Sequence, residues 1–184
     1  MCFTPTSATT GAGAPKWAEM FVALLRAVNV GGHNSLPMAE LRAALDAVGA
    51  TRVQTYLQSG NAVFASLQDP AVLEAALAEA IAARCGFRPV LQIWPGPELA
   101  TALAQNRFGA SDVHGVALER AADPASLAAV AAPAERFALR GRMLWLHLPD
   151  GVGRSRLAQK AAALTPGATA RNLRTLTALA GLAA

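Results

Sequence analysis

A polar stretch near the start of the chain combines the residue types of an anion-binding loop. Arg26 follows five apolar residues, and Asn29, Gly31 and Gly32 come soon after it. A guanidinium group makes paired hydrogen bonds to phosphate and carboxylate oxygens, and glycine lets backbone N–H groups approach a ligand closely. The stretch therefore predicts a phosphate or carboxylate site. The alternative is a plain turn in which Arg26 pairs with an acid.

A second polar turn, Ser59-Gly60-Asn61, follows an alternating segment of the sequence. These residue types are typical of a hairpin turn, which is the simplest interpretation. In the functional alternative, Ser59 and Asn61 point into the cleft that holds Arg26. Tyr56, on the polar side of the preceding strand, would then be placed to stack on a base or ring.

Basic residues are concentrated at the end of the chain. Residues 136–184 hold 8 Arg and Lys against a single acid, Asp150, whereas residues 1–135 hold 8 against 11 acids. Such asymmetry concerns binding partners rather than fold, and the alternative is that arginine simply solvates outer faces. In the functional interpretation, a cluster of this region contacts phosphate groups. It consists of Arg154, Ser155, Arg156, Lys160, Arg171, Asn172 and Arg174, with Arg156, Arg171 and Asn172 as the expected ligand-binding residues.

Helical spacing supports this second interpretation. Arg156 and Lys160 are four residues apart, and Arg171 and Arg174 are three apart. Each pair would share one face of a helix. We therefore expect the ligand-binding cleft to combine the glycine loop, the hairpin turn and these C-terminal helices.

The sequence lacks the motifs that identify common enzymes and cofactor sites. There is no GxxxxGK[ST], GxGxxG, HExxH or CxxC pattern, so no cofactor and no metal are expected. The three histidines lie far apart in the sequence, and only His33 and Ser59 are candidates for an acid–base group or a nucleophile. An enzyme acting on a small anionic substrate in the same cleft remains the alternative to a binding module.

Cysteine content and hydropathy indicate the cellular setting. Cys2 and Cys85 provide no disulfide framework, which favours a reducing cytoplasm. No apolar run approaches the roughly 20 residues of a membrane helix, so no membrane is expected among the partners. Residues 1–18 lack the basic start and apolar middle of a signal peptide and are predicted to be a disordered tail, with Met20 as an alternative start.

The periodicity predicts an α+β fold of two tandem ferredoxin-like units with antiparallel sheets, residues 19–95 and 96–184. In the first unit Ser35 is expected to cap a helix beginning at Pro37, and Asp69 to cap the next helix. The predicted strands are 19–26, 52–58, 62–66 and 88–94, and the helices are 37–48 and 70–84.

The second unit repeats this order more weakly, after a connecting helix over 95–105. Asp123 is expected to cap its first helix. The predicted strands are 113–118, 136–140, 143–148 and 166–169, and the helices are 124–131, 154–164 and 171–182.

Several segments together resemble one bacterial family. They are FVALLRAVNVGG at 21–32, MAELR at 38–42 and YLQSGNAVF at 56–64, followed by GVGRSRL at 151–157 and ATARNLRT at 168–175. The combination is similar to the family called domain of unknown function 1697. Arg156 stands where that family usually has lysine, and Leu173 where an aromatic residue is common. The resemblance implies two ferredoxin-like subdomains and supplies no activity.

We therefore expect a module that binds a phosphorylated or anionic small molecule, or nucleic acid as the larger alternative, in a cleft between two units. A protein that serves only structure or dimer formation would instead expose a large apolar patch.

Overall fold

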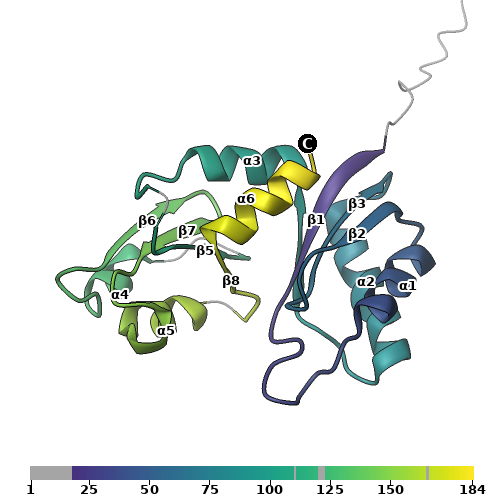
Figure 1. Ribbon diagram of the computed structural model, residues 1–184, viewed down its shortest axis with the longest axis horizontal. Helices are drawn as coiled ribbons and strands as arrows, with labels where there is room; N and C mark the ends of the chain where they lie inside the picture. Colours follow the sequence, from purple (N-terminus) through teal and green to yellow (C-terminus); the bar gives the residue numbers. More distant parts are fainter. Residues whose placement is uncertain (1–17, 110, 120–122, 165) are drawn as a thin grey trace, which may run out of the picture.

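The structure is a computed structural model that describes residues 18–109, 111–119, 123–164 and 166–184. Almost all of the predicted tail, residues 1–18, lies outside the described residues. The fold is α+β, with two four-stranded antiparallel sheets joined side by side (Figure 1). The division of the chain at residues 95 and 96 stays a prediction.

The first unit has the predicted β-α-β-β-α-β order, and its strands lie in the order β2-β3-β1-β4. β1 occupies the centre because it pairs with both β3 and β4. The elements are β1 (Glu19–Leu25), α1 (Met38–Ala47), β2 (Thr51–Thr55), β3 (Asn61–Ser66), α2 (Pro70–Cys85) and β4 (Leu91–Pro95).

The second unit repeats this topology with the strand order β6-β7-β5-β8. α3 (Gly96–Ala104) connects the units, and α6 (Leu173–Leu182) ends the chain. The other elements are β5 (Val113–Ala117), α4 (Pro124–Ala128), β6 (Arg136–Arg140), β7 (Met143–His147), a 3₁₀ turn (Val152–Arg154), α5 (Arg156–Ala162) and β8 (Thr169–Asn172).

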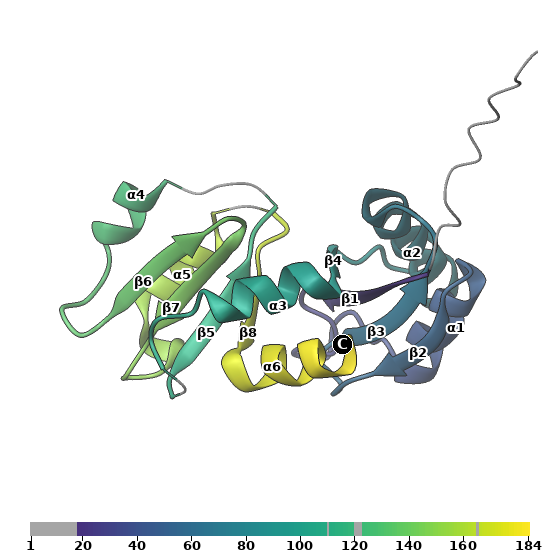
Figure 2. The same ribbon diagram turned by 90° about the horizontal axis from the view of Figure 1, so that it is seen from above.

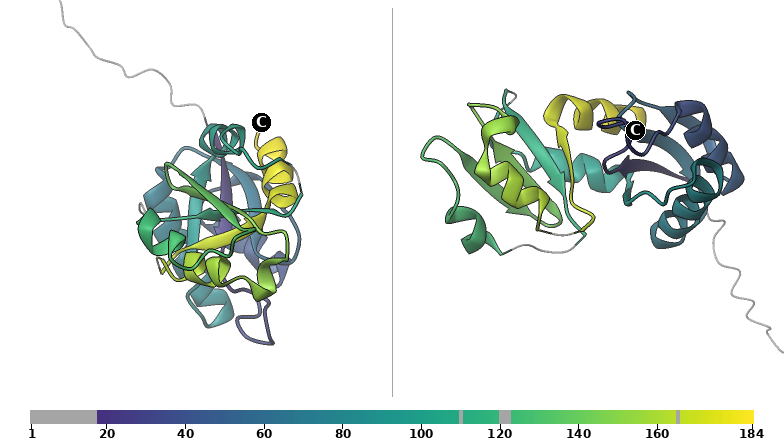
Figure 3. Two further views of the ribbon diagram at one scale, coloured as in Figure 1. Left: turned by 90° about the vertical axis from the view of Figure 1, so that its left-hand side faces the viewer. Right: turned by 90° about the horizontal axis from the view of Figure 1, so that it is seen from below.

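The structure has three apolar cores. One lies on the outer face of each sheet, and the third lies between the two units. β1 is buried on both faces: Phe21 and Leu25 point toward α1 and α2, whereas Val22 and Leu24 point into a core shared by the two units. This explains why β1 reads as a continuous apolar run rather than an alternation. α3 and α6 lie along the shared core, and α4 and α5 cover the far face of the second sheet (Figures 2 and 3).

Gly115 of β5 lies in close contact with the shared core. A Cβ atom there would lie 2.5 Å from Leu176 Cδ1 and 3.1 Å from Trp145. β5 therefore approaches α6 closely at this point, and a side chain at position 115 would require Leu176 to shift.

The predicted caps are confirmed at two helices and wrong at one. Asp69 accepts a hydrogen bond from Ala71 N, and Asp123 caps α4. At α1, however, Pro37 is the N-cap in an extended conformation, and Ser35 makes no cap. The reason lies in Asn29, whose side chain holds both backbone groups of Leu36 and delays the helix to Met38.

The prediction for the last strand and helix is also wrong in its boundaries. The strand lies at Thr169–Asn172 rather than at 166–169, so Arg171 belongs to β8 and pairs across from Gly115. The side chain of Asn172 accepts a hydrogen bond from Thr175 N, which fixes the start of α6 after the arginine. Arg171 and Arg174 therefore do not share a helical face.

Helix length argues against a membrane-spanning segment in the described residues. Within residues 18–184, apart from the gaps given above, no helix has both the length and the apolar character needed to cross a bilayer.

Candidate functional site

A cleft of about 500 Å³ opens where the end of β1 faces the loop between α5 and β8. Arg26, directly after β1, donates a hydrogen bond across it to the carbonyl of Pro166. The backbone N–H of Arg26 donates to Val90 O, which holds Arg26 beside the segment that leads into β4. The lining residues come from both units: Arg26, Ala27, Asn34, Arg88, Pro89, Val90, Ala162, Ala163 and Pro166.

The charge of this cleft is positive. Arg26 and Arg88 contribute guanidinium groups, and none of the lining residues is acidic. Arg88 forms an ion pair with Glu79, in which both side chains are more than half exposed. An exposed pair of this kind contributes only about 0–1 kcal/mol, so an incoming anion can compete for the arginine.

Asn29 fixes the shape of the glycine loop through hydrogen bonds of its side chain and does not line the cleft. The Asn29 amide donates to Leu36 O and Gln58 O, at 2.9 and 2.8 Å, and accepts from Leu36 N. Gly31 and Gly32 have φ values of +61° and +76° and lie exposed at the turn, outside the cleft. The loop therefore supports the position of Arg26 and brings no glycine N–H group into the cleft lining.

The hairpin turn is closely packed against the end of β1. At Gly60, whose φ is +75°, a Cβ atom would meet Val28 Cγ2 at 2.4 Å. Asn61 is fully buried, and its amide donates to Tyr56 O and Ser59 Oγ at 3.0 and 2.9 Å. Both donor bonds are internal to the turn. The side-chain oxygen of Asn61 is left to accept a hydrogen bond from another part of the protein.

Arg171 of β8 donates hydrogen bonds to this turn and to the end of β1. Its Nε donates to Asn61 Oδ1 at 2.6 Å, and its Nη2 donates to Leu25 O and Ser59 O at 2.6 and 2.9 Å. These acceptors are uncharged, and burial lowers the pKa of the guanidinium to about 10. The structure thus brings together four of the predicted site residues at the junction, whereas of the predicted site residues only Arg26 lines the cleft. The four are Ser59, Gly60, Asn61 and Arg171.

Two predicted residues lie elsewhere. Asn172 serves as the cap of α6. Arg156 is exposed and lines a separate cleft of about 410 Å³ on the second unit, together with Arg154 and the acids Glu135 and Asp150. Arg154 and Arg156 therefore line a different cleft from Arg26.

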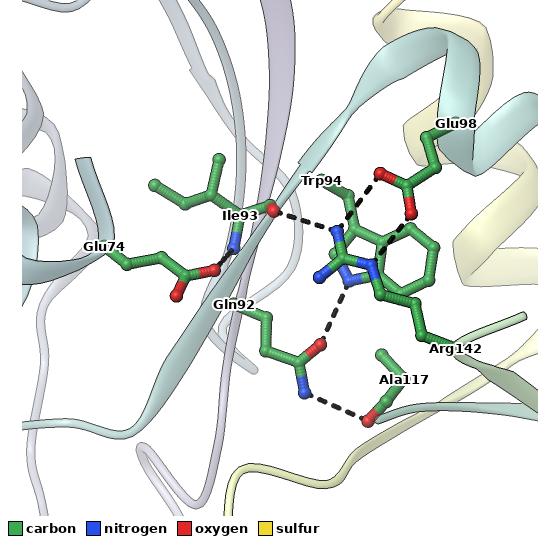
Figure 4. A network of polar contacts seen from close by, with 7 residues as sticks. All are labelled: Glu74, Gln92, Ile93, Trp94, Glu98, Ala117 and Arg142. Carbon is green, nitrogen blue, oxygen red and sulfur yellow. Dashed lines mark hydrogen bonds and ion pairs between the residues drawn. The ribbon is translucent and has the colours of Figure 1, made fainter. Parts of the chain in front are cut away.

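Sequence reasoning missed a polar network centred on Gln92 (Figure 4). Gln92 is buried, accepts from Trp94 Nε1 at 3.1 Å, and donates to Ala117 O and Gly167 O at 3.0 and 2.6 Å. Because Gly167 follows Pro166, this glutamine fixes one wall of the cleft. The available signal was a glutamine inside the otherwise apolar strand Leu91–Pro95.

Arg142 completes this network from the second unit. Its guanidinium lies 3.8 Å from the centroid of the Trp94 ring and donates to Glu98 at 2.8 Å and Ile93 O at 3.2 Å (Figure 4). On the other side of β4, Glu74 accepts from Ile93 N at 2.7 Å. Burial raises the pKa of Glu74, the hydrogen bond from Ile93 and the charge of Arg142 oppose the rise, and Glu119 adds to it.

The candidate catalytic groups lie outside the cleft. His33 and Ser59 are exposed in their loops, and neither is among the lining residues of the cleft. His114 lines a different, apolar pocket, and burial lowers the pKa of its imidazole. Among the described residues, no group of three or more His, Cys, Asp or Glu side chains is placed to hold a metal ion.

Comparison with known families gives the clearest relationship. Residues 19–145 match the family described as a protein of unknown function, DUF1697. The chain belongs to the DUF1697 family. The match contains the glycine loop, the hairpin turn and Arg142, whereas the similarity of 151–157 and 168–175 to that family stays an expectation.

A solved structure shares this DUF1697 fold. It is described as the structure of conserved bacterial protein SP0830 from Streptococcus pneumoniae, with 20% sequence identity and a TM-score of 0.73. The alignment covers 91% of this chain and 99% of that one. At this identity the similarity concerns the fold alone. No curated protein matches the chain.

Proposed function

We propose that this protein binds a small anionic ligand, such as a phosphate ester or a carboxylate, in the cleft between its two units. The observation that supports this most directly is that Arg26 and Arg88 both line a cleft in which no described lining residue is acidic. Guanidinium groups are suited to planar, two-point recognition of such anions.

The cleft is also held rigidly from both sides. Arg26 reaches the carbonyl of Pro166, and Gln92 holds the neighbouring Gly167. A preformed site loses less conformational entropy on binding than a flexible one. This rigidity supports binding without large rearrangement of the units.

A binding module is favoured over the enzyme and the nucleic-acid alternatives. Among the residues that the structure describes, the lining of the cleft includes no histidine, cysteine, serine or carboxylate that could transfer a proton or attack a substrate. Two of the basic residues near the C-terminus make contacts between the units: Arg142 with Ile93 O and the Trp94 ring, and Arg171 with Asn61. Arg156 lines a different cleft from Arg26 and Arg88, which argues against one basic track for a nucleic-acid backbone through these residues.

The proposal includes a cytoplasmic location. Cys85 is a free thiol, as is usual in a reducing compartment.

Isothermal titration with inorganic phosphate, sulfate and acetate tests the proposal. A hydrogen bond to a charged group contributes about 1.5–3 kcal/mol, so Arg88→Gln is expected to weaken phosphate binding about tenfold or more. The matched control is Arg107→Gln, since Arg107 is exposed and lies outside the cleft. Absence of binding of all three anions at low salt, or equal affinity in Arg88→Gln and the parent, would overturn the proposal.

A further inference from the structure

An apolar pocket adjoins the charged cleft. It has a volume of about 210 Å³ and lies between α5 and the strands β5, β7 and β8. Ala162 lines both this pocket and the cleft, and Ala163 lines the cleft only. The pocket and the cleft therefore meet at the C-terminal end of α5.

The pocket exists because α5 presents small side chains to the sheet. Ala158 and Ala162 are four residues apart on one helical face, opposite Val116 and Leu146 of the sheet. A larger residue at either alanine would occupy the space. The lining is almost entirely apolar, with His114 and Gln159 as the polar members.

We infer that the natural ligand is an amphiphilic anion, with its charged group at Arg26 and Arg88 and an apolar group in the pocket beside Ala162. This inference rests on the proposed function and adds the chemical class of the ligand. An apolar cavity of about 150 Å³ is enough to hold benzene, so the pocket admits one six-membered ring or a short branched chain. Burying such a group out of water adds affinity without any further charge.

The chemistry of the lining favours an apolar occupant over a polar one. Burial lowers the pKa of His114, so its ring is neutral at pH 7. Val116, Leu146 and Ala158 offer no hydrogen bond to a polar substituent. A sugar or an amino group placed there would lose its hydration without compensation.

The test compares phosphate monoesters that carry the same charged group, with inorganic phosphate as the reference. Inorganic phosphate, glycerol 3-phosphate, phenyl phosphate and benzyl phosphate are titrated by calorimetry into the full chain. At least one aryl ester is expected to bind about tenfold more tightly than glycerol 3-phosphate, which corresponds to about 1.4 kcal/mol. In NMR spectra, the aryl esters should also shift the ring protons of His114 and leave those of the exposed His33 in place.

Filling the pocket provides the matched variants. Ala158→Leu is expected to abolish the aryl advantage while phosphate affinity stays within twofold, because Ala158 does not line the cleft. Ala170→Leu serves as a second filling variant, since Ala170 is exposed and its replacement is tolerated more easily. Ala83→Leu, on an exposed face of α2, is the control.

The outcomes separate the two proposals. Phosphate binding without any gain from an aryl group overturns the amphiphilic ligand and leaves the anion site standing. An aryl gain that survives in both filled variants also overturns it, because the apolar group then lies elsewhere. Absence of binding by every ester removes both proposals together.

Discussion

The Nε atom of Arg171 lies 2.6 Å from Oδ1 of Asn61, and this hydrogen bond joins the last strand of the second unit to the hairpin of the first. The same guanidinium donates to the carbonyls of Leu25 and Ser59. Carbonyl and amide dipoles, rather than a carboxylate, stabilise the buried charge. This buried cation is therefore one of the contacts that fix the orientation of the two units, beside the shared apolar core.

Replacing that cation should destabilise the whole protein. In Arg171→Lys, a single ammonium cannot supply the fork that reaches Asn61 and two carbonyls, and buried acceptors lose their donors. We expect a loss of about 3 kcal/mol or more in the free energy of unfolding, measured by urea denaturation at pH 7. Arg174→Lys is the control, because Arg174 is exposed on α6. Equal urea midpoints for the two variants would contradict the role of Arg171.

The stacking of Arg142 on Trp94 should be measurable as a coupling energy. A cation over an aromatic ring contributes about 0.5–2 kcal/mol, depending on how far it is desolvated. A double-mutant cycle with Arg142→Met and Trp94→Leu, each of which removes one partner of the contact, is expected to give a coupling in this range by chemical denaturation. Arg136→Met, on an exposed position of β6, should change stability by less than about 0.5 kcal/mol. A coupling of zero would mean that Arg142 acts through Glu98 and Ile93 and not through the Trp94 ring.

Glu74 offers a prediction with a defined sign. Its folded-state pKa is raised, chiefly by burial, so its stabilising effect is complete at pH values below the ordinary 4.5 and is lost as the pH rises through the folded-state pKa. Glu74→Gln keeps an acceptor for Ile93 N and cannot ionise, and is expected to be at least as stable as the parent at pH 7. Glu74→Ala removes the acceptor and should cost about 1–2 kcal/mol. Thermal unfolding at pH 4 and pH 7 distinguishes these cases, and a Gln variant as unstable as the Ala variant would refute the assignment.

His114 should contribute to acid destabilisation. Its folded-state pKa lies below the ordinary 6.5 because burial penalises the imidazolium, while Asp112 acts weakly in the opposite direction. The unfolded chain therefore binds more protons near and below pH 6.5, and stability falls as the pH drops through that range. In His114→Gln the slope of stability between pH 7.5 and 5 should be smaller than in the parent. Urea midpoints at four pH values provide the measurement.

The fold was predictable because its signals are local. The apolar run before Arg26, the proline and aspartate at the start of α2, and the alternation before the Ser59 turn each depend on neighbours in the sequence. The boundary at Arg171 was not predictable in this way. The strand that contains Arg171 forms by pairing with β5. The position of the Arg171 side chain is set by acceptors that lie 110 or more residues away in the sequence.

The candidate site was only partly predictable for the same reason. Arg26 stood out because a charge ends an apolar strand. Arg88 did not, since it looks like an ordinary basic residue after a helix. Gln92 and Arg142 act across the junction between the units, and no local pattern indicates which residue of one unit faces which residue of the other.

The contacts at Ile93 have a consequence for the protein in a crowded solution. β4 is an outer strand of its sheet, and its outward N–H and C=O at Ile93 are occupied by Glu74 and Arg142. A strand from another chain would need these same groups in order to add to the sheet. The two side chains thus close the edge against intermolecular pairing, and removing both should favour aggregation even under conditions in which each unit stays folded.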